Sequence, residues 1–348
     1  MNNSWVYNIS KTYMTEVLNI KKPKVLIVSI EKVWNITEND LAPLKAIADV
    51  DWFQTKNLSQ EKLAERCRGY DHLMLNVDAL ESIPSKMERI DEKFYNHEGT
   101  SGLKSLNQDM TDSDYFSPMI GTKRGLLIQD CPNTTTQSVA ESTVCEILMH
   151  TRKRHLAYMD EMKNKKVECR TGLNLKGKTV GIVGYGSIGS RVGNILTGFG
   201  MNVLAHDIKR INIQNTPIEK LFSLSDVISI HTPTIRQDGG SNIGLIDSRL
   251  INLCDDAVLV NLATDVVVDP SAAANGLRSG KLSAYSTQSD YAGEYGKKYL
   301  KHFKGIDGFH LSPCSFDSPE SRENIKRVWI QNTISMIQGN PINPWNKQ

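Results

Sequence analysis

Long apolar runs, paired cysteines and an excess of one charge are all missing from this sequence. No apolar stretch approaches the roughly 18 residues that a membrane-spanning helix needs, and the first residues contain no hydrophobic signal-peptide segment. The six cysteines are scattered without metal-ligand spacing, which predicts reduced thiols, a cytoplasmic protein and no metal site. With 41 basic and 39 acidic residues, the net charge of +2 argues against a nucleic-acid or membrane partner.

The composition that remains is typical of a globular protein with two domains. The chain has 348 residues, of which 39% are hydrophobic and 23% charged. Its first part alternates short apolar runs with polar, helix-like segments, a pattern that predicts βα units on a parallel sheet. The expected strands are residues 24–30, 50–53, 72–75 and 126–128.

Two further segments of the first part lead to distinct expectations. Residues 87–118 are polar and lack a clear period, so we expect a long loop or insertion there. Ser138 is followed three residues later by Glu141, the pattern of a capping box. We therefore expect a helix that begins at Ser138 and runs to about Met162.

The most informative motif is a glycine-rich turn between an apolar strand and a helix-compatible segment. Residues 179–189 read TVGIVGYGSIG and place G-x-G-x-x-G at Gly184, Gly186 and Gly189. In such a turn the first glycine permits the sharp bend, the second lets the backbone approach a pyrophosphate, and the third lets the helix pack on the strand. The next apolar run ends at Asp207, about 20 residues on, where a carboxylate binds ribose hydroxyls and repels a 2′-phosphate. The sequence thus predicts NAD as cofactor in preference to NADP.

Several stretches together resemble the D-2-hydroxyacid dehydrogenases. The resemblance is carried by "LKGKTVGIVGYGSIGSRV", "FGMNVLAHD", "LSDVISIHTPT", "GLIDSRLINLCDDAVLVNLATDVVVD" and "GKLSAY", with "TQSVAESTVCEILM" before them and "GNPINPWN" after them. It implies an α/β protein with two domains on parallel sheets, one Rossmann-like and one flavodoxin-like. The substrate domain would comprise residues 1–149 and 314–348, with the NAD-binding domain, residues 150–313, inserted. It also implies a small-molecule substrate in the cleft and a homodimer.

The resemblance extends the cofactor site beyond the glycine turn. In the family, the segment equivalent to His231-Thr-Pro233 lies beside the adenosine and the nicotinamide ribose, although His231 is more simply a strand-end histidine paired with backbone. Lys209 and Arg210 could bind the 2′-phosphate of NADP only if the Asp207 side chain pointed away from the ribose. The expected nucleotide contacts are Gly184, Gly186, Ser187, Ile188, Gly189, Asp207, Thr232, Pro233 and Ala263.

The residues that carry out the family's chemistry are missing. Hydride transfer to a 2-keto acid requires a cation that holds the carboxylate, an acid that protonates the alkoxide and a carboxylate that tunes this acid. In the family that the sequence resembles, these groups are an Arg, a His and a Glu. Thr264 stands where the motif N-x-A/S-R-G has its Arg, Asp265 replaces the glycine, and Cys314 replaces the His. In the family motif D-x-x-x-x-E-P, Gln288 replaces the Asp and Gly293 replaces the Glu, while Glu294 lies one residue after the position of that Glu. Residues 110–114 depart from the motif G-x-G-x-D of the substrate domain.

These losses predict little turnover of ordinary 2-keto acids. Losing a general acid costs about 10²–10⁴ in rate, and losing a charge-assisted clamp costs roughly a further 10–150-fold. One interpretation is an NAD(H)-dependent oxidoreductase with a different substrate; the alternative is a catalytically silent NAD-binding sensor or assembly protein. In the first, polar groups would come from Cys314, Asp265, Gln288, His310, Tyr291 or Glu294. For Cys314 and His310, a packing role in the interior is the simpler explanation.

Overall fold

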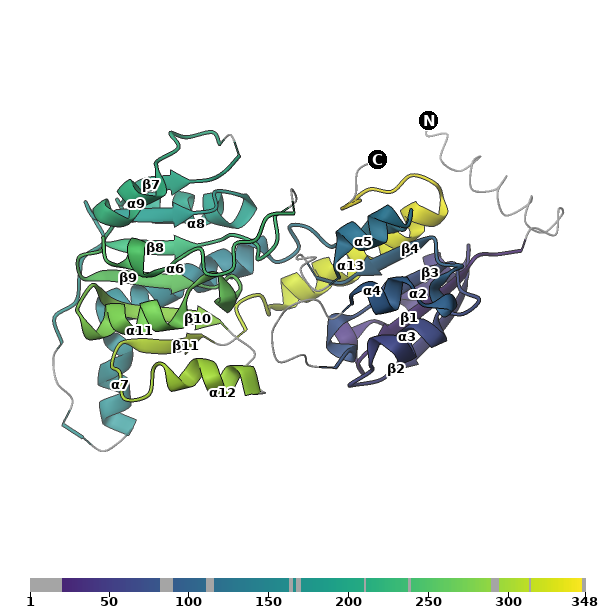
Figure 1. The fold of residues 1–348 in the computed structure, drawn as a ribbon, viewed down its shortest axis with the longest axis horizontal. Helices are drawn as coiled ribbons and strands as arrows, with labels where there is room; N and C mark the ends of the chain where they lie inside the picture. The colour runs from purple at the N-terminus through teal and green to yellow at the C-terminus, as the bar shows by residue number, and fades with distance from the viewer. Residues whose placement is uncertain are drawn as a thin grey trace. The chain divides into compact units, whose positions relative to one another are not determined.

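The chain folds into two compact units in this computed structural model. The described residues are 21–81, 90–110, 116–162, 165–166, 170–209, 211–236, 239–288, 294–312 and 314–345. The first unit comprises Met1–Thr134 and Pro319–Gln348, and the second comprises Thr135–Ser318. The C-terminal segment therefore returns to the unit in which the chain began, with the second unit inserted between its two parts (Figure 1).

The first unit is built on a parallel sheet of five strands in the order β2-β1-β3-β4-β5. This is the order of flavodoxin-like folds. The strands are β1 Lys24–Ser29, β2 Asp49–Gln54, β3 His72–Leu75, β4 Ser105–Gln108 and β5 Leu127–Gln129. The helices are η1 Val33–Asn35, α2 Glu38–Lys45, α3 Gln60–Arg66, η2 Val77–Ala79, α4 Glu92–Tyr95, η3 Glu98–Thr100, α5 Pro118–Lys123 and α13 Pro319–Ile337. The four strands expected from the sequence are confirmed to within one residue at each end.

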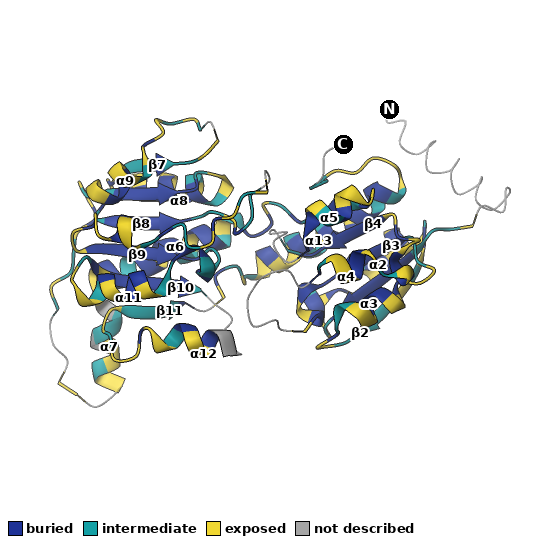
Figure 2. Cartoon of the chain, viewed as in Figure 1, coloured by how far each residue is buried: buried dark blue, intermediate teal, exposed yellow. Residues whose placement is uncertain are grey.

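Helices cover both faces of this sheet, so its strands other than the edge strand β2 are buried along most of their length (Figure 2). Leu26 on β1 packs in one core with Leu63 of α3 and Phe94 of α4. Its neighbour Ile27 points to the opposite core, which contains Trp329 of α13. The four consecutive apolar residues of β1, Val25 to Val28, are what a parallel strand with two covered faces requires.

The prediction of a long loop at residues 87–118 is wrong for the middle of this segment. That segment contains α4, η3 and the buried strand β4, while residues 82–89 and 111–115 lie outside the described part of the chain. The side-chain amide of Asn107 on β4 donates hydrogen bonds to the Trp329 carbonyl and to Oγ1 of Thr333, both at 2.7 Å. The indole of Trp329 donates to the Asn107 carbonyl at 3.0 Å. Helix α13 therefore satisfies the polar groups that made this strand look like a loop.

The second unit is built on a parallel sheet of six strands in the order β11-β10-β9-β8-β6-β7. The strands are β6 Thr179–Val183, β7 Asn202–His206, β8 Val227–Ile230, β9 Ala257–Asn261, β10 Leu282–Gln288 and β11 Phe309–Ser312. The helices are α6 Thr136–Arg152, α7 Arg154–Met162, α8 Ser187–Gly198, α9 Ile218–Leu224, α10 Ser248–Ile251, η4 Asp265–Val267, α11 Pro270–Arg278 and α12 Glu294–Lys301. The strand order reverses between β6 and β8, which makes the carboxyl ends of these two strands a topological switch point.

This sheet also carries helices on both faces. On one side, Ile147 of α6 and Leu196 of α8 pack with Ile182 of β6. On the other side, α9, α10, α11 and α12 pack over Val183 and the alternate residues of the neighbouring strands. The chain is thus an α/β protein with two parallel-sheet domains, as the sequence predicts.

Helix α6 begins earlier than expected, and the predicted capping box is wrong. The helix starts at Thr136, two residues before Ser138. The Ser138 hydroxyl lies 2.9 Å from that of Ser318, and the Glu141 carboxylate accepts from the side chain of Gln137 at 2.5 Å. Because both side chains have these other partners, neither caps the helix. The expected single helix is also interrupted at Lys153, whose left-handed φ of 52° separates α6 from α7.

The placement of α6 bears on the domain boundary. A boundary between residues 149 and 150 would fall inside this helix, whereas the structure assigns the whole helix to the second unit. Apolar side chains of α6 explain this assignment, since Val139, Val144 and Ile147 belong to the core that also contains α8. At its other end, the second unit extends to Ser318, beyond the expected limit at residue 313.

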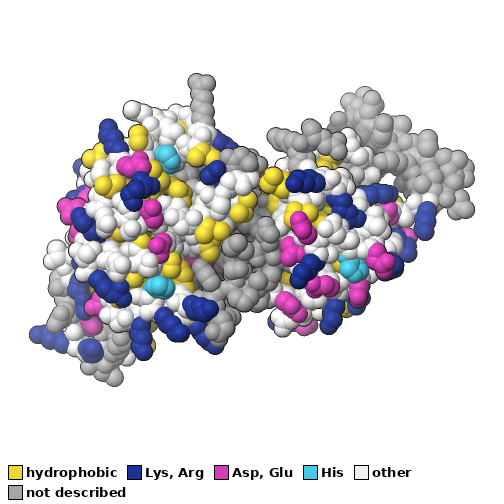
Figure 3. Space-filling view, in the orientation of Figure 1, with side chains coloured by type: hydrophobic (Ala, Val, Ile, Leu, Met, Phe, Trp, Pro, Cys, Tyr) yellow, Lys and Arg dark blue, Asp and Glu magenta, His cyan; other side chains and the backbone are white. Residues whose placement is uncertain are grey.

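The surface charges are mixed in sign. On the face drawn in Figure 3, basic and acidic side chains are interspersed over each unit. Among the described residues, no helix is both long enough and apolar enough to cross a bilayer.

Candidate functional site

The glycine turn between β6 and α8 has the geometry of a nucleotide-binding turn. Gly184 has a φ of +88°, and a Cβ there would lie 2.5 Å from the carbonyl oxygen of His231. A Cβ at Gly189 would lie 2.1 Å from the Gly184 oxygen. Neither position accepts a side chain, because each backbone packs directly on another. At Gly186, by contrast, a Cβ would meet nothing within 4 Å, so open space lies beside the start of α8.

Asp207 is held against this turn by backbone contacts. It follows β7, and its Oδ2 accepts from the backbone N–H of Tyr185, between the first two glycines, at 2.8 Å. Its Oδ1 accepts from the N–H of Lys209, also at 2.8 Å. Each carboxylate oxygen retains lone pairs that a ribose hydroxyl could use. Arg210 lies outside the described residues.

The end of β8 borders the same turn. The Cγ2 methyl of Thr232 would lie 2.9 Å from a Cβ at Gly184, and its hydroxyl oxygen is buried without a hydrogen-bond partner. His231 pairs its Nε2 with the Ser229 hydroxyl at 2.8 Å, so its partner is this side chain in place of the expected backbone group. Burial lowers the pKa of His231 to about 4. A bound dinucleotide fits these observations, because it would fill the open space at Gly186 and could supply a hydrogen-bond partner to the Thr232 hydroxyl.

The turn after β9 carries Ala263 and Thr264. The buried side chain of Asn261 organises this turn, since its Nδ2 donates to the Thr264 carbonyl at 3.0 Å and its Oδ1 accepts from the Ala263 N–H at 3.2 Å. Thr264 is half-buried, whereas Asp265 is fully buried and accepts from the N–H of Val266 at 2.9 Å. The structure therefore puts the Thr264 side chain near the surface of the turn and the Asp265 carboxylate in the interior of the unit.

The side chain of Gln288 connects the end of β10 with the segment that follows β11. The Oε1 of Gln288, the last residue of β10, accepts from the N–H of Ser315 at 3.0 Å and also from its hydroxyl. Cys314, directly before Ser315, is exposed. Residues 289–293, including Tyr291, and the side chain of Glu294 lie outside the described part of the structure.

All of these segments lie at one edge of one sheet. In the strand register, Val183 pairs with Ile230, Ile230 with Asn261, and Asn261 with Thr287. The glycine turn, Thr232, Thr264 and Gln288 therefore follow the carboxyl ends of neighbouring parallel strands, and Cys314 follows the adjacent strand β11. Open α/β sheets bind their ligands at this edge.

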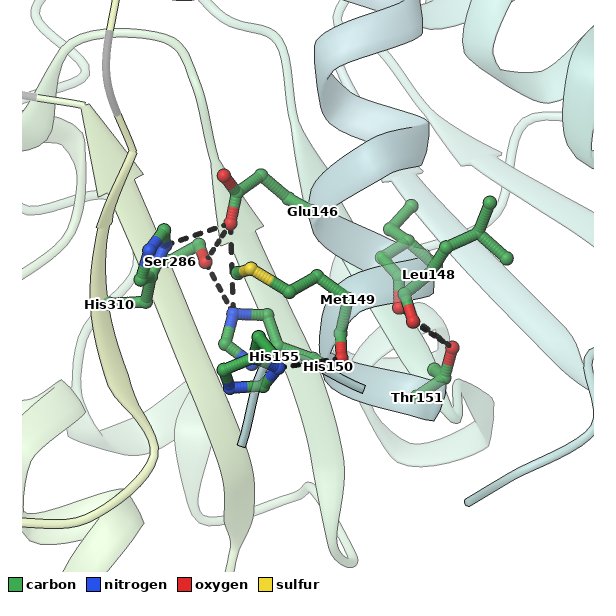
Figure 4. Close-up of polar contacts among 9 residues, drawn as sticks. Glu146, Leu148, Met149, His150, Thr151, His155, Ser286 and His310 are labelled. Atoms are coloured by element: carbon green, nitrogen blue, oxygen red, sulfur yellow. Dashed lines mark hydrogen bonds and ion pairs between the residues drawn. The ribbon is translucent and has the colours of Figure 1, made fainter. Parts of the chain in front are cut away.

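A separate polar cluster lies where α6 crosses β10 and β11 (Figure 4). His310 Nδ1 lies 3.1 Å from Glu146 Oε2, and the Ser286 hydroxyl donates to the same oxygen at 2.6 Å. His150 Nε2 lies 2.5 Å from the Ser286 oxygen. Burial lowers the pKa of His150 to about 4. Burial disfavours ionisation of Glu146 as well, but its hydrogen bonds from His310 and Ser286 outweigh this and lower its pKa.

This cluster was not predicted from the sequence. Its residues show no metal-ligand spacing, and a packing role was the simpler expectation for His310, because the partner residues are far apart in the chain. One local indication was present, since Glu146 and His150 are four residues apart and thus share a helix face. His310, Ser286 and α6 meet only in the folded unit.

The switch point, the glycine turn and Asp207 define the second unit as a dinucleotide-binding domain of the class found in two-domain oxidoreductases. Residues 145–289 match the family described as D-isomer specific 2-hydroxyacid dehydrogenase, NAD binding domain. The chain is 30% identical over 337 residues to the glyoxylate reductase of Thermofilum pendens, an alignment that covers 91% of this chain and 92% of that protein. The chain belongs to the D-isomer-specific 2-hydroxyacid dehydrogenase family, and its cofactor is NAD.

Solved structures share the fold of the whole chain. A glyoxylate reductase from Paecilomyes thermophila superposes with a TM-score of 0.79 at 17% identity, covering 93% of this chain and 98% of that one. D-lactate dehydrogenase from Aquifex aeolicus, determined with NAD and lactic acid, superposes with a TM-score of 0.74 at 21% identity, covering 91% and 96%. These likenesses concern the fold. The predictions of family, of two α/β domains and of NAD are therefore confirmed.

Proposed function

We propose that this protein is an NAD(H)-dependent oxidoreductase whose substrate is not an ordinary 2-hydroxy or 2-keto acid. The observation that supports the proposal is that Thr264, Gln288 and Cys314 lie at the ends of β9, β10 and β11, on the sheet edge that carries the nucleotide turn. The motif spacing of the sequence aligns them with the family's Arg, Asp and His. NAD(H), when bound, supplies or accepts the hydride. A neutral hydroxyl at position 264 suits a neutral polar group of the substrate better than a carboxylate, since it offers no countercharge.

Cys314 is the residue to which we assign proton transfer. Its side chain is exposed at the end of β11, where the family has its proton donor. A thiol is a weak acid with a pKa of about 8.5 and can give or take a proton at Sγ. Gln288 acts as a positioning residue, because its hydrogen bonds to Ser315 fix the segment that carries Cys314. Asp265, which follows Thr264 in the chain, is a buried carboxylate. We assign the acidic role of the family's Glu to Glu294, at the start of α12, because position 293 is a glycine.

Steady-state assays with saturating NADH test this assignment. With pyruvate, glyoxylate, hydroxypyruvate or phenylpyruvate, the wild-type protein should show turnover near background. Among neutral aldehydes and ketones, at least one should be reduced, and Cys314→Ala should slow that reaction about 10²–10⁴-fold. Brisk reduction of a 2-keto acid that Cys314→Ala leaves unchanged would place the chemistry on other residues.

A gain-of-function variant complements these assays. Thr264→Arg combined with Cys314→His restores a carboxylate clamp and an imidazole, and it should raise turnover of at least one of the four 2-keto acids. Adding Asp265→Gly and a Glu at position 293 completes the family pattern. The gain should be partial, because residues 110–114 also depart from that pattern.

We further propose that the cofactor site prefers NADH to NADPH. The Asp207 carboxylate, held beside the glycine turn by the N–H groups of Tyr185 and Lys209, would repel a 2′-phosphate. Fluorescence titration should give tighter binding of NADH than of NADPH. Asp207→Asn should reduce this difference in affinity, because it removes the negative charge while it keeps one oxygen for a backbone contact. Equal affinities for the two nucleotides in the wild type would show that Lys209 or Arg210 governs the pocket.

We also propose a homodimer formed through the second units. Helix α7 supports this proposal, because three of its large apolar side chains are exposed: Tyr158 at 62%, Met159 at 44% and Met162 at 65%. Figure 1 shows α7 at the lower margin of this unit. Exposed apolar side chains that gather on one element are typical of association surfaces.

A cytoplasmic location is part of the proposal as well. The cysteines among the described residues, Cys67, Cys131, Cys145, Cys254 and Cys314, form no disulfide. Reduced thiols of this kind are typical of proteins that work in a reducing compartment.

A further inference from the structure

Three donor atoms of the types that bind transition metals converge beside the sheet of the second unit. The ligand atoms of Glu146, His150 and His310 all lie within 4.8 Å of one another. Oε2 of Glu146 is 3.1 Å from Nδ1 of His310 and 3.8 Å from Nε2 of His150. In a tetrahedral zinc site with bonds of about 2.0–2.2 Å, neighbouring ligand atoms lie about 3.2–3.6 Å apart. Small side-chain rotations would bring the three atoms to that spacing.

Rigid elements hold these side chains in place. Glu146 and His150 lie one turn apart on α6, a helix of 17 residues. His310 on β11 is the register partner of Ser286 on β10, so the two strands present their side chains at the same level. Figure 4 shows the four side chains directed toward one point between the helix and the strands. Ligands that project from helices and strands keep their geometry better than ligands on loops.

Ser286 holds two of the proposed ligand atoms in place in the metal-free protein. Its hydroxyl donates to Glu146 Oε2 at 2.6 Å and lies 2.5 Å from His150 Nε2. A metal bound to His150 Nε2 would displace the contact of that nitrogen with Ser286, whereas Glu146 Oε2 has a second lone pair and could keep its hydrogen bond. Access comes from the side of His310, whose side chain is 34% exposed, whereas those of Glu146 and His150 are 8% and 4% exposed.

We propose that Glu146, His150 and His310 form a binding site for a divalent transition metal, with Zn²⁺ as the best match. Two imidazoles and one carboxylate favour zinc over Mg²⁺ or Ca²⁺, which prefer sites made of oxygen ligands alone. Three protein ligands leave a fourth position for water or for the Ser286 hydroxyl. The site lies on the face of the sheet that α6 covers, and the metal would fasten this helix to β10 and to the edge strand β11.

In the absence of metal, the same atoms hydrogen-bond to one another, so the unit folds without it. The test is therefore metal binding by the folded, full-length protein. Isothermal titration of chelator-treated protein with ZnCl₂ should give one equivalent bound. Titration with Co²⁺ should produce visible d–d absorption of the intensity typical of four-coordinate sites.

His310→Gln is the decisive variant, because this side chain is the most exposed of the three ligands and its replacement should leave the fold intact. We expect it to weaken Zn²⁺ binding at least about 10-fold and to remove the Co²⁺ absorption. His302→Gln is the matched control, since it removes an exposed histidine from the same unit, and binding should not change. Circular dichroism verifies folding of each protein.

Two results would overturn the proposal. One is the absence of saturable Zn²⁺ binding by the folded wild-type protein. The other is equal affinity of wild type and His310→Gln, which would assign any bound zinc to other side chains. Thermal unfolding gives a second readout, because Zn²⁺ should raise the midpoint of wild type and His302→Gln but not that of His310→Gln.

Discussion

The three glycines of the nucleotide turn differ in what a side chain would meet. At Gly184 and Gly189 a Cβ would collide with backbone at 2.5 and 2.1 Å, so substitution there disturbs the fold itself. At Gly186 the Cβ would enter open space. A substitution at this position therefore separates nucleotide binding from folding.

We predict that Gly186→Val leaves the protein folded and weakens NADH binding at least about 100-fold, because the added side chain occupies the approach of the pyrophosphate. Gly198→Val serves as control, since a Cβ at this other end of α8 also meets nothing within 4 Å. Fluorescence titration with NADH measures both variants. Unaltered binding by Gly186→Val would mean that the pyrophosphate does not pass over this turn.

At the scale of elements, one buried carboxylate ties together segments that follow different strands of the first unit. Oδ2 of Asp109, directly after β4, accepts from the Trp34 indole and from the Asn76 amide, both at 2.6 Å. Oδ1 accepts from the N–H of Val77 at 3.3 Å. Burial raises the pKa of Asp109 to about 7, with the charge of Asp78 adding to the effect and the hydrogen bonds opposing it.

This raised pKa predicts a pH-dependent stability. Unfolded Asp titrates near about 3.9, so between that pH and about 7 the folded protein holds a proton that the unfolded chain has released. Stability from this group is complete below about pH 4 and is lost as the pH rises through about 7. We expect the free energy of unfolding of wild type to fall by roughly 2–4 kcal/mol relative to that of Asp109→Asn between pH 5 and pH 8.

Tryptophan fluorescence during urea unfolding measures this difference within the first unit. All five tryptophans lie outside residues 135–318, so their signal follows this unit. Parallel stability curves for wild type and Asp109→Asn across the pH range would show that Asp109 is ionised in the folded state throughout.

At the scale of the whole molecule, charged substitutions on α7 should disrupt the proposed homodimer. We predict that Met159→Glu combined with Met162→Glu converts a dimer to a monomer, because two apolar side chains that are 44% and 65% exposed would become charged in the interface. Light scattering after size-exclusion chromatography gives the mass. Leu224→Glu is the control, since this residue is 51% exposed on α9. A monomeric wild type, or a dimer that persists in the α7 variant, would contradict this arrangement.

The sequence by itself determined the elements that depend only on residues close together in the chain. The glycine turn was recognisable because its three glycines have a fixed spacing between an apolar strand and a helix-compatible segment, all within about a dozen residues. Strands β1 and β3 were recognisable because continuous apolar runs are what a parallel sheet with two covered faces requires. Strands β2 and β5 were recognisable as short apolar stretches between polar, helix-like segments. The positions of Thr264 and Cys314 followed from their spacing in motifs of the family.

Tertiary structure decided whatever depended on partners distant in the chain. Strand β4 contains polar residues, and it became a buried strand because α13, more than 200 residues later, supplies hydrogen bonds to Asn107. Helix α6 starts before its apparent cap because Ser138 meets Ser318. Glu146, His150 and His310 form a cluster only when β10 and β11 pack against α6. Sequence spacing encodes local geometry, whereas the pairing of polar groups depends on which elements the folded chain brings into contact.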